Sequence, residues 1–273
     1  MRGYIISSII IIFWVVMTVL FIRKEVIPSL PSLVQPSYEA YLKSPDYDKD
    51  IMMNIYFRGQ SIGFSHTVIN LLENNQTSID NITTINFPMI FGNLFDPSSL
   101  SGADKKEDKK DSNGIAMELI GKSIIDDNYK LKSFNFSAKS PFLNYTISGE
   151  VKGDFLEFTT YDGVKHYNNR LPYKSTSTVS DGLSPFISMP HLAVGKEWVI
   201  NFVNPFTASI ETLQARVENL TKIDWKDKTY DAYEVILSNP KMPKQLKYTA
   251  YITPDGKILK QEILFPGLYL IRE

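Results

Sequence analysis

From residue 51 onward, apolar and polar residues alternate in short runs that are separated by turn residues. In residues 246–252, for example, every second side chain is apolar: Leu246, Tyr248, Ala250 and Ile252. A period of two is typical of a strand with one buried face and one face in water, which is the usual pattern of antiparallel sheets. The pattern therefore predicts a β-rich domain over residues 51–273.

Turn chemistry between these runs predicts how the strands are connected. Residues 51–57 and 61–72 flank Arg58-Gly59-Gln60, and this arrangement predicts a hairpin. Residues that tolerate a positive φ or favour a turn recur at Asn74-Asn75, Asp126-Asp127-Asn128, Lys152-Gly153-Asp154, Tyr161-Asp162-Gly163 and Pro254-Asp255-Gly256. We expect roughly ten to twelve strands in a sandwich, barrel or curled sheet.

Helical periodicity is weak beyond the N-terminus. A short helical turn is predicted around residues 38–42, and residues 181–194 predict a helical or irregular crossover because Pro185 and Pro190 interrupt the strand pattern. The predicted fold class is therefore mainly β, a large curled antiparallel sheet or half-open barrel with one short helical crossover.

Residues 4–22 form an uncharged apolar run that predicts a transmembrane helix. A helix of this length spans about 28 Å, close to the hydrocarbon thickness of a bilayer. The anchor prediction is carried by the apolar and interfacial side chains of the run, among them Tyr4, Ile10, Phe13, Trp14 and Ile22. The alternative is a cleaved signal peptide, whose apolar core is shorter and ends at small residues, whereas Arg23 and Lys24 follow here.

The predicted organisation is a membrane anchor at 1–25, a stalk at 26–50 and a β domain at 51–273. Pro28, Pro31 and Pro36 favour an extended stalk. Residues 96–114 contain the sequence DKKEDKKD, which has no apolar side chain to bury and predicts a solvated, mobile loop. The positive charges on the two sides of the apolar run are nearly balanced, so the short N-terminal tail decides the orientation. We expect a single-pass protein whose bulk is extracytoplasmic, on the periplasmic side of a bacterial inner membrane.

Charge and composition exclude several classes of function. Lys and Arg total 29 and Asp and Glu total 30, which gives a formal net charge of −1 and no basic surface for nucleic acid. The absence of Cys excludes disulfides, thiolate zinc sites and a cysteine nucleophile. The 15 Tyr and 16 Phe residues favour strands.

No catalytic motif is present. His66, His166 and His191 stand outside any recognisable signature, and the Gly-x-Ser-x-Gly elbow is absent. A hydrolase that uses one of these histidines stays as an alternative because a triad is defined by geometry rather than by sequence. We predict that the chain is not an enzyme.

No metal or cofactor site is predicted either. Asp46, Asp48 and Asp50 have the spacing of the first calcium-loop ligands, but Ile51 and Phe57 occupy the positions that need glycine and glutamate. Glycine-rich phosphate loops and the H-E-x-x-H motif are also absent.

Aromatic residues of the predicted strands are the remaining candidates for a binding site. They are expected to line a concave apolar face that shelters an acyl chain: Phe155, Phe158, Trp198, Phe202 and Trp225. The alternative is that the same side chains fill the core of an ordinary sheet.

Four segments carry a resemblance to known proteins. They are residues 55–64 (IYFRGQSIGF), 192–198 (LAVGKEW), 228–235 and 251–262. These segments resemble β-rich bacterial envelope domains of unknown function, including the domains that precede transglutaminase-like domains. The resemblance implies a half-open barrel similar to the periplasmic lipoprotein-carrier fold, whose concave face shelters acyl chains in some members. It implies no individual functional residue.

Two functional hypotheses follow. In the first, the chain is a non-enzymatic, membrane-tethered domain that binds a lipid, a lipoprotein or an envelope polymer. In the second, it is an accessory subunit that docks on a membrane transporter or secretion complex through a sheet edge and the anchor helix. The expected partners are thus the lipid bilayer and either an acyl lipid, a lipoprotein or a membrane complex.

Overall fold

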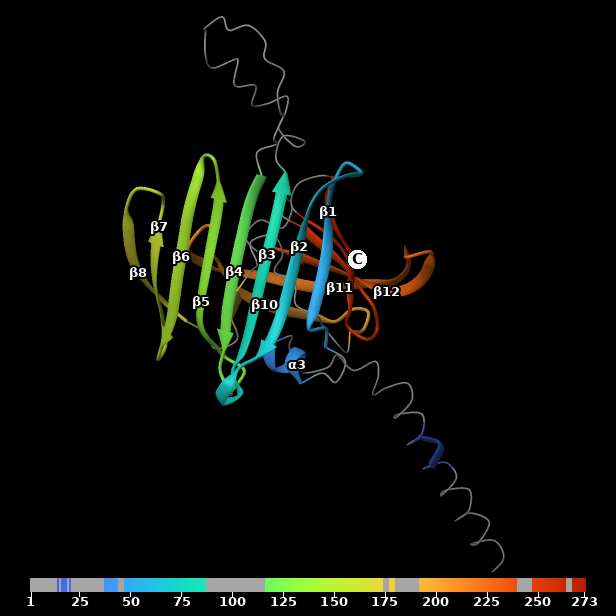
Figure 1. Ribbon diagram of the computed structural model, residues 1–273. Helices are drawn as coiled ribbons and strands as arrows, with labels where there is room; N and C mark the ends of the chain where they lie inside the picture. The colour runs from blue at the N-terminus through green and yellow to red at the C-terminus, as the bar shows by residue number, and fades with distance from the viewer. Residues whose placement is uncertain are drawn as a thin grey trace, which may run out of the picture.

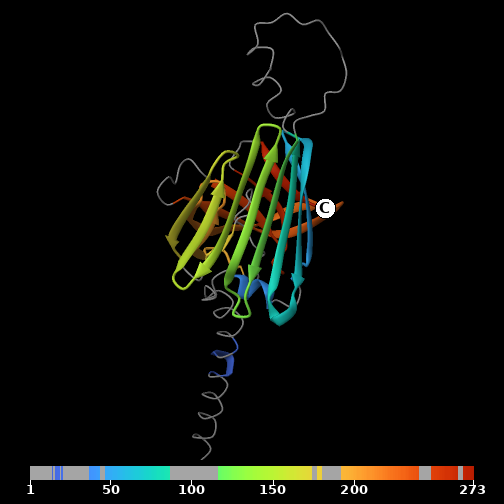
Figure 2. The same cartoon turned by 60° about the vertical axis from the view of Figure 1, so that its left-hand side comes forward.

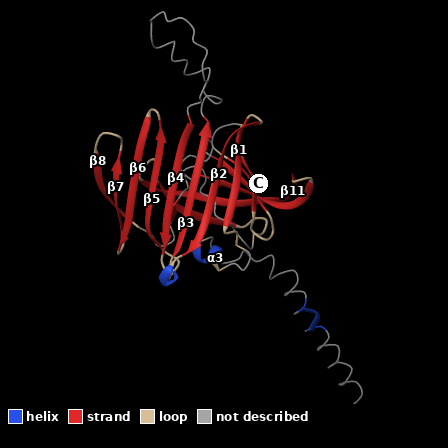
Figure 3. Ribbon diagram, in the orientation of Figure 1, coloured by secondary structure: helices blue, strands red, loops and turns tan. Residues whose placement is uncertain are grey.

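The computed structural model describes residues 14, 16–18, 20, 37–43, 47–86, 116–173, 177–179, 192–239, 247–263 and 267–273. Among the described residues from 37 onward there are two short helices, the α-helix α3 (Tyr38–Leu42) and a 3-10 turn at Glu73–Asn75. Within the described residues, no helix is both long enough and apolar enough to cross a bilayer. Figure 3 shows that almost all of the described chain is strand.

The strands are β1 (Asp50–Phe57), β2 (Gln60–Leu71), β3 (Thr77–Asn86), β4 (Ala116–Ile125), β5 (Leu131–Ser140), β6 (Leu143–Lys152), β7 (Phe155–Tyr161), β8 (His166–Pro172), β9 (Thr178–Val179), β10 (Glu197–Asn204), β11 (Ser209–Trp225), β12 (Lys228–Ser238), β13 (Lys247–Ile252), β14 (Ile258–Glu262) and β15 (Leu268–Arg272).

These 15 strands form one sheet in the order β8-β7-β6-β5-β4-β3-β2-β1-β15-β14-β13-β12-β11-β10-β9. Neighbouring strands are antiparallel, except that β9 runs parallel to β10 over two residues. The first and last strands pair with each other, with Ile55 opposite Leu270. The sheet is therefore two meanders joined by the pairing of the first strand with the last.

The sheet curls so that its two halves pack against each other. Figure 1 shows β1 to β8 as one layer with β10 to β12 crossing behind it, and Figure 2 shows the same two layers after a turn of 60°. One core cluster joins Ile55 and Ile62 of the front layer to Trp198 and Leu213 of the back layer. A second joins side chains of β4 to β7 to Val203 of β10. The inner face carries both hydrophobic clusters, together with a few buried polar side chains such as Ser65, Asn81 and Thr83, which bond to one another. The outer face of the sheet is in water.

The mainly β, curled antiparallel sheet predicted from the sequence is confirmed. The hairpin predicted at 51–72 is β1 and β2, and the helical turn predicted at 38–42 is α3. The expected number of strands was too low, because β9, β14 and β15 have only two, five and five residues and show little alternation. Of the crossover predicted at 181–194, only residues 192–194 lie within the described residues, and they are not helical.

Helix α3 packs on the β domain, although it falls in the segment predicted as a stalk. Tyr38 is buried in the second core cluster, and its hydroxyl accepts a hydrogen bond from the Val179 N–H at 3.0 Å. Burial raises the pKa of Tyr38 to about 12. The hydroxyl of Tyr41 donates to the carbonyl oxygen of Asp48 at 2.7 Å. Residues 37–43 and 47–49 are therefore fastened to the domain that follows them.

Gly63 lies opposite Ile85 in the β2–β3 pairing, next to the bulge in the β1–β2 pairing. A Cβ atom on Gly63 would lie 1.9 Å from the carbonyl oxygen of Thr84, so the backbone would have to move. Gly121 on β4 offers a matched comparison, because a Cβ there would lie 3.8 Å from the ring of Phe136, an ordinary contact.

We predict that Gly63→Ala lowers the free energy of unfolding by about 3 kcal/mol, in the upper range for overpacking. Gly121→Ala should leave it unchanged or raise it by about 0.5 kcal/mol, because alanine loses less chain entropy on folding than glycine. Urea denaturation of the full chain in mild detergent, followed by circular dichroism, measures both. Equal effects of the two substitutions would show that the close approach of β2 and β3 is not tight.

Candidate functional site

The structure separates the five aromatic residues predicted to line one apolar site. Phe158, Trp198 and Phe202 belong to the two core clusters and are only 5%, 5% and 3% exposed. Phe155 and Trp225 are partly exposed and lie elsewhere. The alternative reading, in which these aromatics fill the core, therefore fits Phe158, Trp198 and Phe202.

Phe155 and Phe158 point to opposite faces of β7. They are three residues apart, and side chains alternate along a strand. Phe158 faces the core, whereas Phe155 lies on the outer face with the guanidinium of Arg170 at 3.7 Å from its ring centroid. This cation–π contact fixes the position of Arg170 on the edge strand β8.

Trp225 closes a different hollow, near the end of the long β11–β12 hairpin. Its indole N–H donates to the carbonyl oxygen of Arg272 at 2.6 Å, and its ring meets the Tyr230 ring edge-to-face at 5.4 Å. Trp225, Tyr230 and Arg272 line a pocket of about 520 Å³. Arg272 also forms an ion pair with Asp48 at 2.9 Å, and both side chains are largely buried. The ion pair at this pocket connects the segment after α3 to the last strand, β15.

A second hollow, lined mainly by polar residues, lies on the outer face of β6, β7 and β8, and we call it the β6–β8 cleft. It has a volume of about 550 Å³ and is lined by Ser148, Gly149, Glu150, Lys152, Glu157, Phe158, Thr159, Asn168, Asn169 and Arg170. None of the polar residues in this set was predicted from the sequence to belong to a binding site.

Strand register brings the polar side chains of the β6–β8 cleft together. One row across the three strands contains Glu150, Glu157 and Arg170, and a neighbouring row contains Ser148, Thr159 and Asn168. Residues directly opposite in antiparallel strands share a face, so both rows project from the same side. The two rows therefore form a continuous polar surface that ends at the edge strand.

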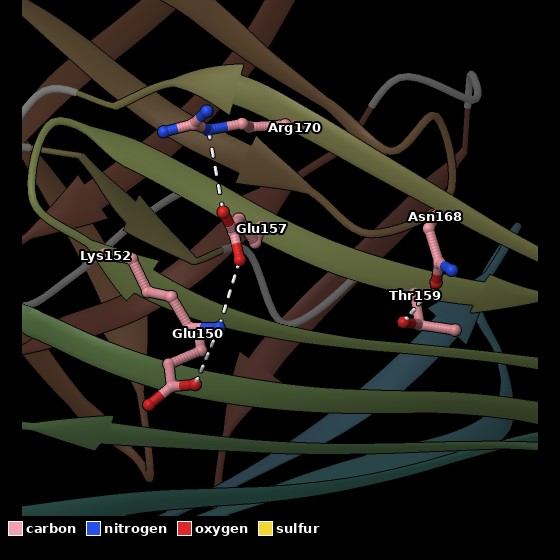
Figure 4. A network of polar contacts seen from close by, with 6 residues as sticks. All are labelled: Glu150, Lys152, Glu157, Thr159, Asn168 and Arg170. Atoms are coloured by element: carbon pink, nitrogen blue, oxygen red, sulfur yellow. Dashed lines mark hydrogen bonds and ion pairs between the residues drawn. The ribbon is translucent and has the colours of Figure 1, made fainter.

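Glu157 is the centre of the charged row. It accepts a hydrogen bond from the ammonium of Lys152 at 3.0 Å and pairs with the Arg170 guanidinium at 3.6 Å. Lys152 also lies 3.9 Å from Glu150, which relieves the repulsion between the two opposed carboxylates. The hydrogen bond to Glu157, together with the charges of Glu157 and Glu150, raises the pKa of Lys152. Figure 4 shows this network.

The second row supplies neutral donors and acceptors. The hydroxyl of Thr159 donates to the side-chain oxygen of Asn168 at 2.7 Å, and the Asn135 amide on β5 donates to the Ser148 hydroxyl at 2.8 Å. Carboxylate, ammonium, guanidinium, amide and hydroxyl groups thus lie beside one another on this surface. Such a surface can bind a ligand rich in hydroxyl and amide groups through hydrogen bonds alone, without burying any apolar group of the ligand.

Two of the three histidines are described, and both lie outside the two hollows. His66 Nε2 is 2.7 Å from Asp50 Oδ1 at the surface, and the His166 ring stacks on Tyr161 with centroids 4.7 Å apart. His191 is not among the described residues. Within the described ranges, no group of three or more histidine and acidic side chains is arranged to hold a metal ion.

The anchor and the charged loop stay predictions. Of the residues named for the anchor, Tyr4, Ile10, Phe13 and Ile22 lie outside the described residues, and Trp14 is helical and 67% exposed. The loop predicted at 96–114 lies entirely outside the described residues.

Comparison with known proteins shows no family and a distant likeness to solved structures, including the following two. No family model and no curated protein matches the sequence. The fold is similar to a β-barrel-like protein of domain of unknown function DUF1849 from Brucella abortus, with 6% identity, coverage of 82% of this chain and 94% of that chain, and a TM-score of 0.48. A DUF1089 family protein from Pseudomonas aeruginosa has 13% identity, coverage of 74% and 90%, and a TM-score of 0.35. Neither description names a ligand or a partner.

Substitutions of Trp198 test whether this side chain belongs to the core or to a binding surface. Its side chain is packed among Leu213 and other core residues, and within the described part of the chain its indole N–H has no hydrogen-bond partner. Val199, the next residue, faces the other way and is 49% exposed, so it serves as a control.

We predict that Trp198→Ala lowers the free energy of unfolding by about 3–5 kcal/mol, the usual cost of removing a large core side chain. Trp198→Phe should cost less than about 1.5 kcal/mol, because it keeps most of the volume and removes the unpaired donor. Val199→Thr should change the value by about 0.5 kcal/mol or less. Urea denaturation measures all three. A Trp198→Ala protein as stable as the Val199→Thr protein would instead indicate a binding surface.

Proposed function

We propose that this chain is a non-enzymatic, membrane-tethered domain that binds a hydroxyl-rich envelope polymer in the β6–β8 cleft. The observation that carries the proposal is the open double row of polar side chains around Glu157. Of the three ligand classes expected from the sequence, a polymer suits this surface best. A polysaccharide offers many hydroxyl and amide groups that can exchange hydrogen bonds with alternating donors and acceptors.

A lipid ligand is less well supported by the packing. The three deepest aromatic residues of the predicted apolar site contact other core side chains. An acyl chain at these positions would have to displace packed groups, and protein interiors are packed about as densely as organic crystals. The resemblance to the lipoprotein-carrier fold therefore supports a curled sheet in this chain but gives little support to an acyl ligand.

The tether rests on the apolar run at residues 4–22. Its described residues Trp14, Val16, Met17 and Leu20 are exposed apolar side chains, which suits contact with lipid. Because α3 is fastened to the β domain, a membrane helix ahead of it would hold the domain near the bilayer. A domain held in this way is suited to retaining a polymer at the membrane surface.

A second proposal is the accessory subunit. It is favoured by Phe142 and Val164, which are 82% and 79% exposed in the β5–β6 and β7–β8 turns. The two turns are adjacent, since a Cβ atom on Gly163 would lie 3.2 Å from the Asn144 carbonyl oxygen. Neighbouring exposed apolar residues are a common feature of docking surfaces.

The polymer proposal is tested by co-sedimentation of the full-length protein, in detergent, with purified peptidoglycan sacculi. Glu157→Gln should weaken binding about tenfold, because it removes the charge that orders Lys152 and Arg170. The control is Glu197→Gln, which alters a similar cross-strand pair with Arg216 on β10 and β11. Both glutamate side chains are partly exposed, so each substitution should change the free energy of unfolding by less than about 1 kcal/mol.

Two results would contradict the proposal. One is a wild-type protein that stays in the supernatant with sacculi at every concentration. The other is equal binding by the Glu157→Gln and Glu197→Gln proteins, which would place the contact away from the cleft.

A further inference from the structure

Strand β8 lies at one end of the described sheet, and no described strand pairs with its outer side. It is the terminal strand of the sheet and pairs with β7 alone among the described strands. Six of its seven residues are exposed, and only Leu171 is of intermediate burial. An exposed edge offers free backbone N–H and C=O groups to another strand. Arg170 and Pro172 protect one end of β8, whereas the stretch Tyr167–Asn168–Asn169 carries no charge.

The side chains of β8 fall on two faces. Tyr167, Asn169 and Leu171 lie opposite Thr160, Phe158 and Leu156 of β7 and so share the inner face. His166, Asn168 and Arg170 share the outer face, where Asn168 and Arg170 line the β6–β8 cleft. A strand added to this edge must match both faces to continue the sheet.

We propose that β8 pairs antiparallel with β8 of a second copy of this chain, centred on Asn169. A two-fold axis perpendicular to the sheet maps each face of the sheet onto itself. Because residues that lie opposite each other in antiparallel strands share a face, this axis must pass through a residue rather than between two residues. Centring on Asn169 sets Tyr167 opposite Leu171 on the inner face, twice. It also sets Asn168 opposite Arg170 on the outer face, where the amide oxygen accepts from the guanidinium.

The neighbouring registers are less favourable. Centring on Arg170 places two guanidinium groups directly opposite each other, which is destabilising. Centring on Asn168 places Arg170 opposite His166, which is repulsive when the histidine is protonated, and separates Tyr167 from Leu171. Registers shifted further pair fewer residues. Charge and apolar pairing thus select one register for the self-paired edge.

A seven-residue edge gives a modest interface, and the proposed tether compensates for this. Two copies held in one membrane meet at a high effective concentration, so a weak contact is sufficient. Pairing would also join the two β6–β8 clefts across the axis, since Asn168 and Arg170 come from the edge strand itself (Figure 4). This last consequence rests on the proposed polymer site and gives that site the length to hold an extended chain.

The register is tested by cysteine cross-linking, for which the chain provides a clean background because it contains no Cys. Asn169→Cys should form a disulfide-linked dimer when membranes of cells that express the full-length protein are oxidised. Directly opposed Cβ atoms lie about 4.5–5.5 Å apart, just beyond the disulfide range of about 3.5–4.5 Å, so a small movement suffices. The control is Asn135→Cys, at an exposed position on β5, three strands from the edge, and should give no more dimer than the unsubstituted chain.

Two further variants sharpen the test. Tyr167→Cys and Leu171→Cys should cross-link when co-expressed, and each alone should not. Asn169→Lys should weaken dimerisation, measured by sedimentation in detergent, about fivefold, because two like charges would face each other.

The self-pairing is wrong if the Asn169→Cys protein forms no more disulfide-linked dimer than the Asn135→Cys protein. In that case the edge is either free or paired with a strand of another protein. If the unsubstituted protein still binds sacculi in that case, the proposed polymer site stands without the dimer. Cross-linking without sacculus binding would instead overturn the polymer proposal alone.

Discussion

The structure depends on the need of a single sheet to bury its one apolar face. Alternation gives each strand an apolar side, and the described residues contain no second sheet or helical layer to cover it. The sheet therefore curls until β10 to β15 cover β1 to β8, and the pairing of β1 with β15 holds the two halves together. Ile55 and Leu270, opposite each other in that pair, are almost completely buried. A sheet closed in this way fills its own concave face, which leaves the outer face and the edges for binding.

The N-terminal segment contributes to the same closure. Tyr38 is buried against the second core cluster and bonded to β9, and the buried ion pair of Asp48 with Arg272 connects the segment after α3 to the last strand. Breaking such a pair leaves an uncompensated charge in a poorly solvated place. The described residues of this segment, 37–43 and 47–49, and the β domain therefore behave as one folded unit.

The sequence was informative where structure is local and silent where it depends on long-range pairing. The hairpin at Gly59 and the strand ending at Ile252 follow from turn chemistry and alternation, and both were predicted. The same alternation places Phe155 and Phe158 on opposite faces of β7, so these two side chains do not line one face. The β6–β8 cleft could not be predicted, because the contact of Glu157 with Arg170 requires the register of β7 against β8. The joining of β1 to β15 likewise depends on pairing across more than 200 residues.

The central claim is that the inner face is a filled core and that ligands bind the outer face of β6 to β8. Hydrogen–deuterium exchange of the full-length protein in detergent, with and without soluble peptidoglycan fragments, tests it most directly. The account predicts that inner-facing strands such as β5 and β11 are well protected without any ligand, and that the fragments slow exchange in β6 to β8. Slow exchange that appears in β10 and β11 only when an acyl lipid is added would contradict it and restore the concave face as the binding site.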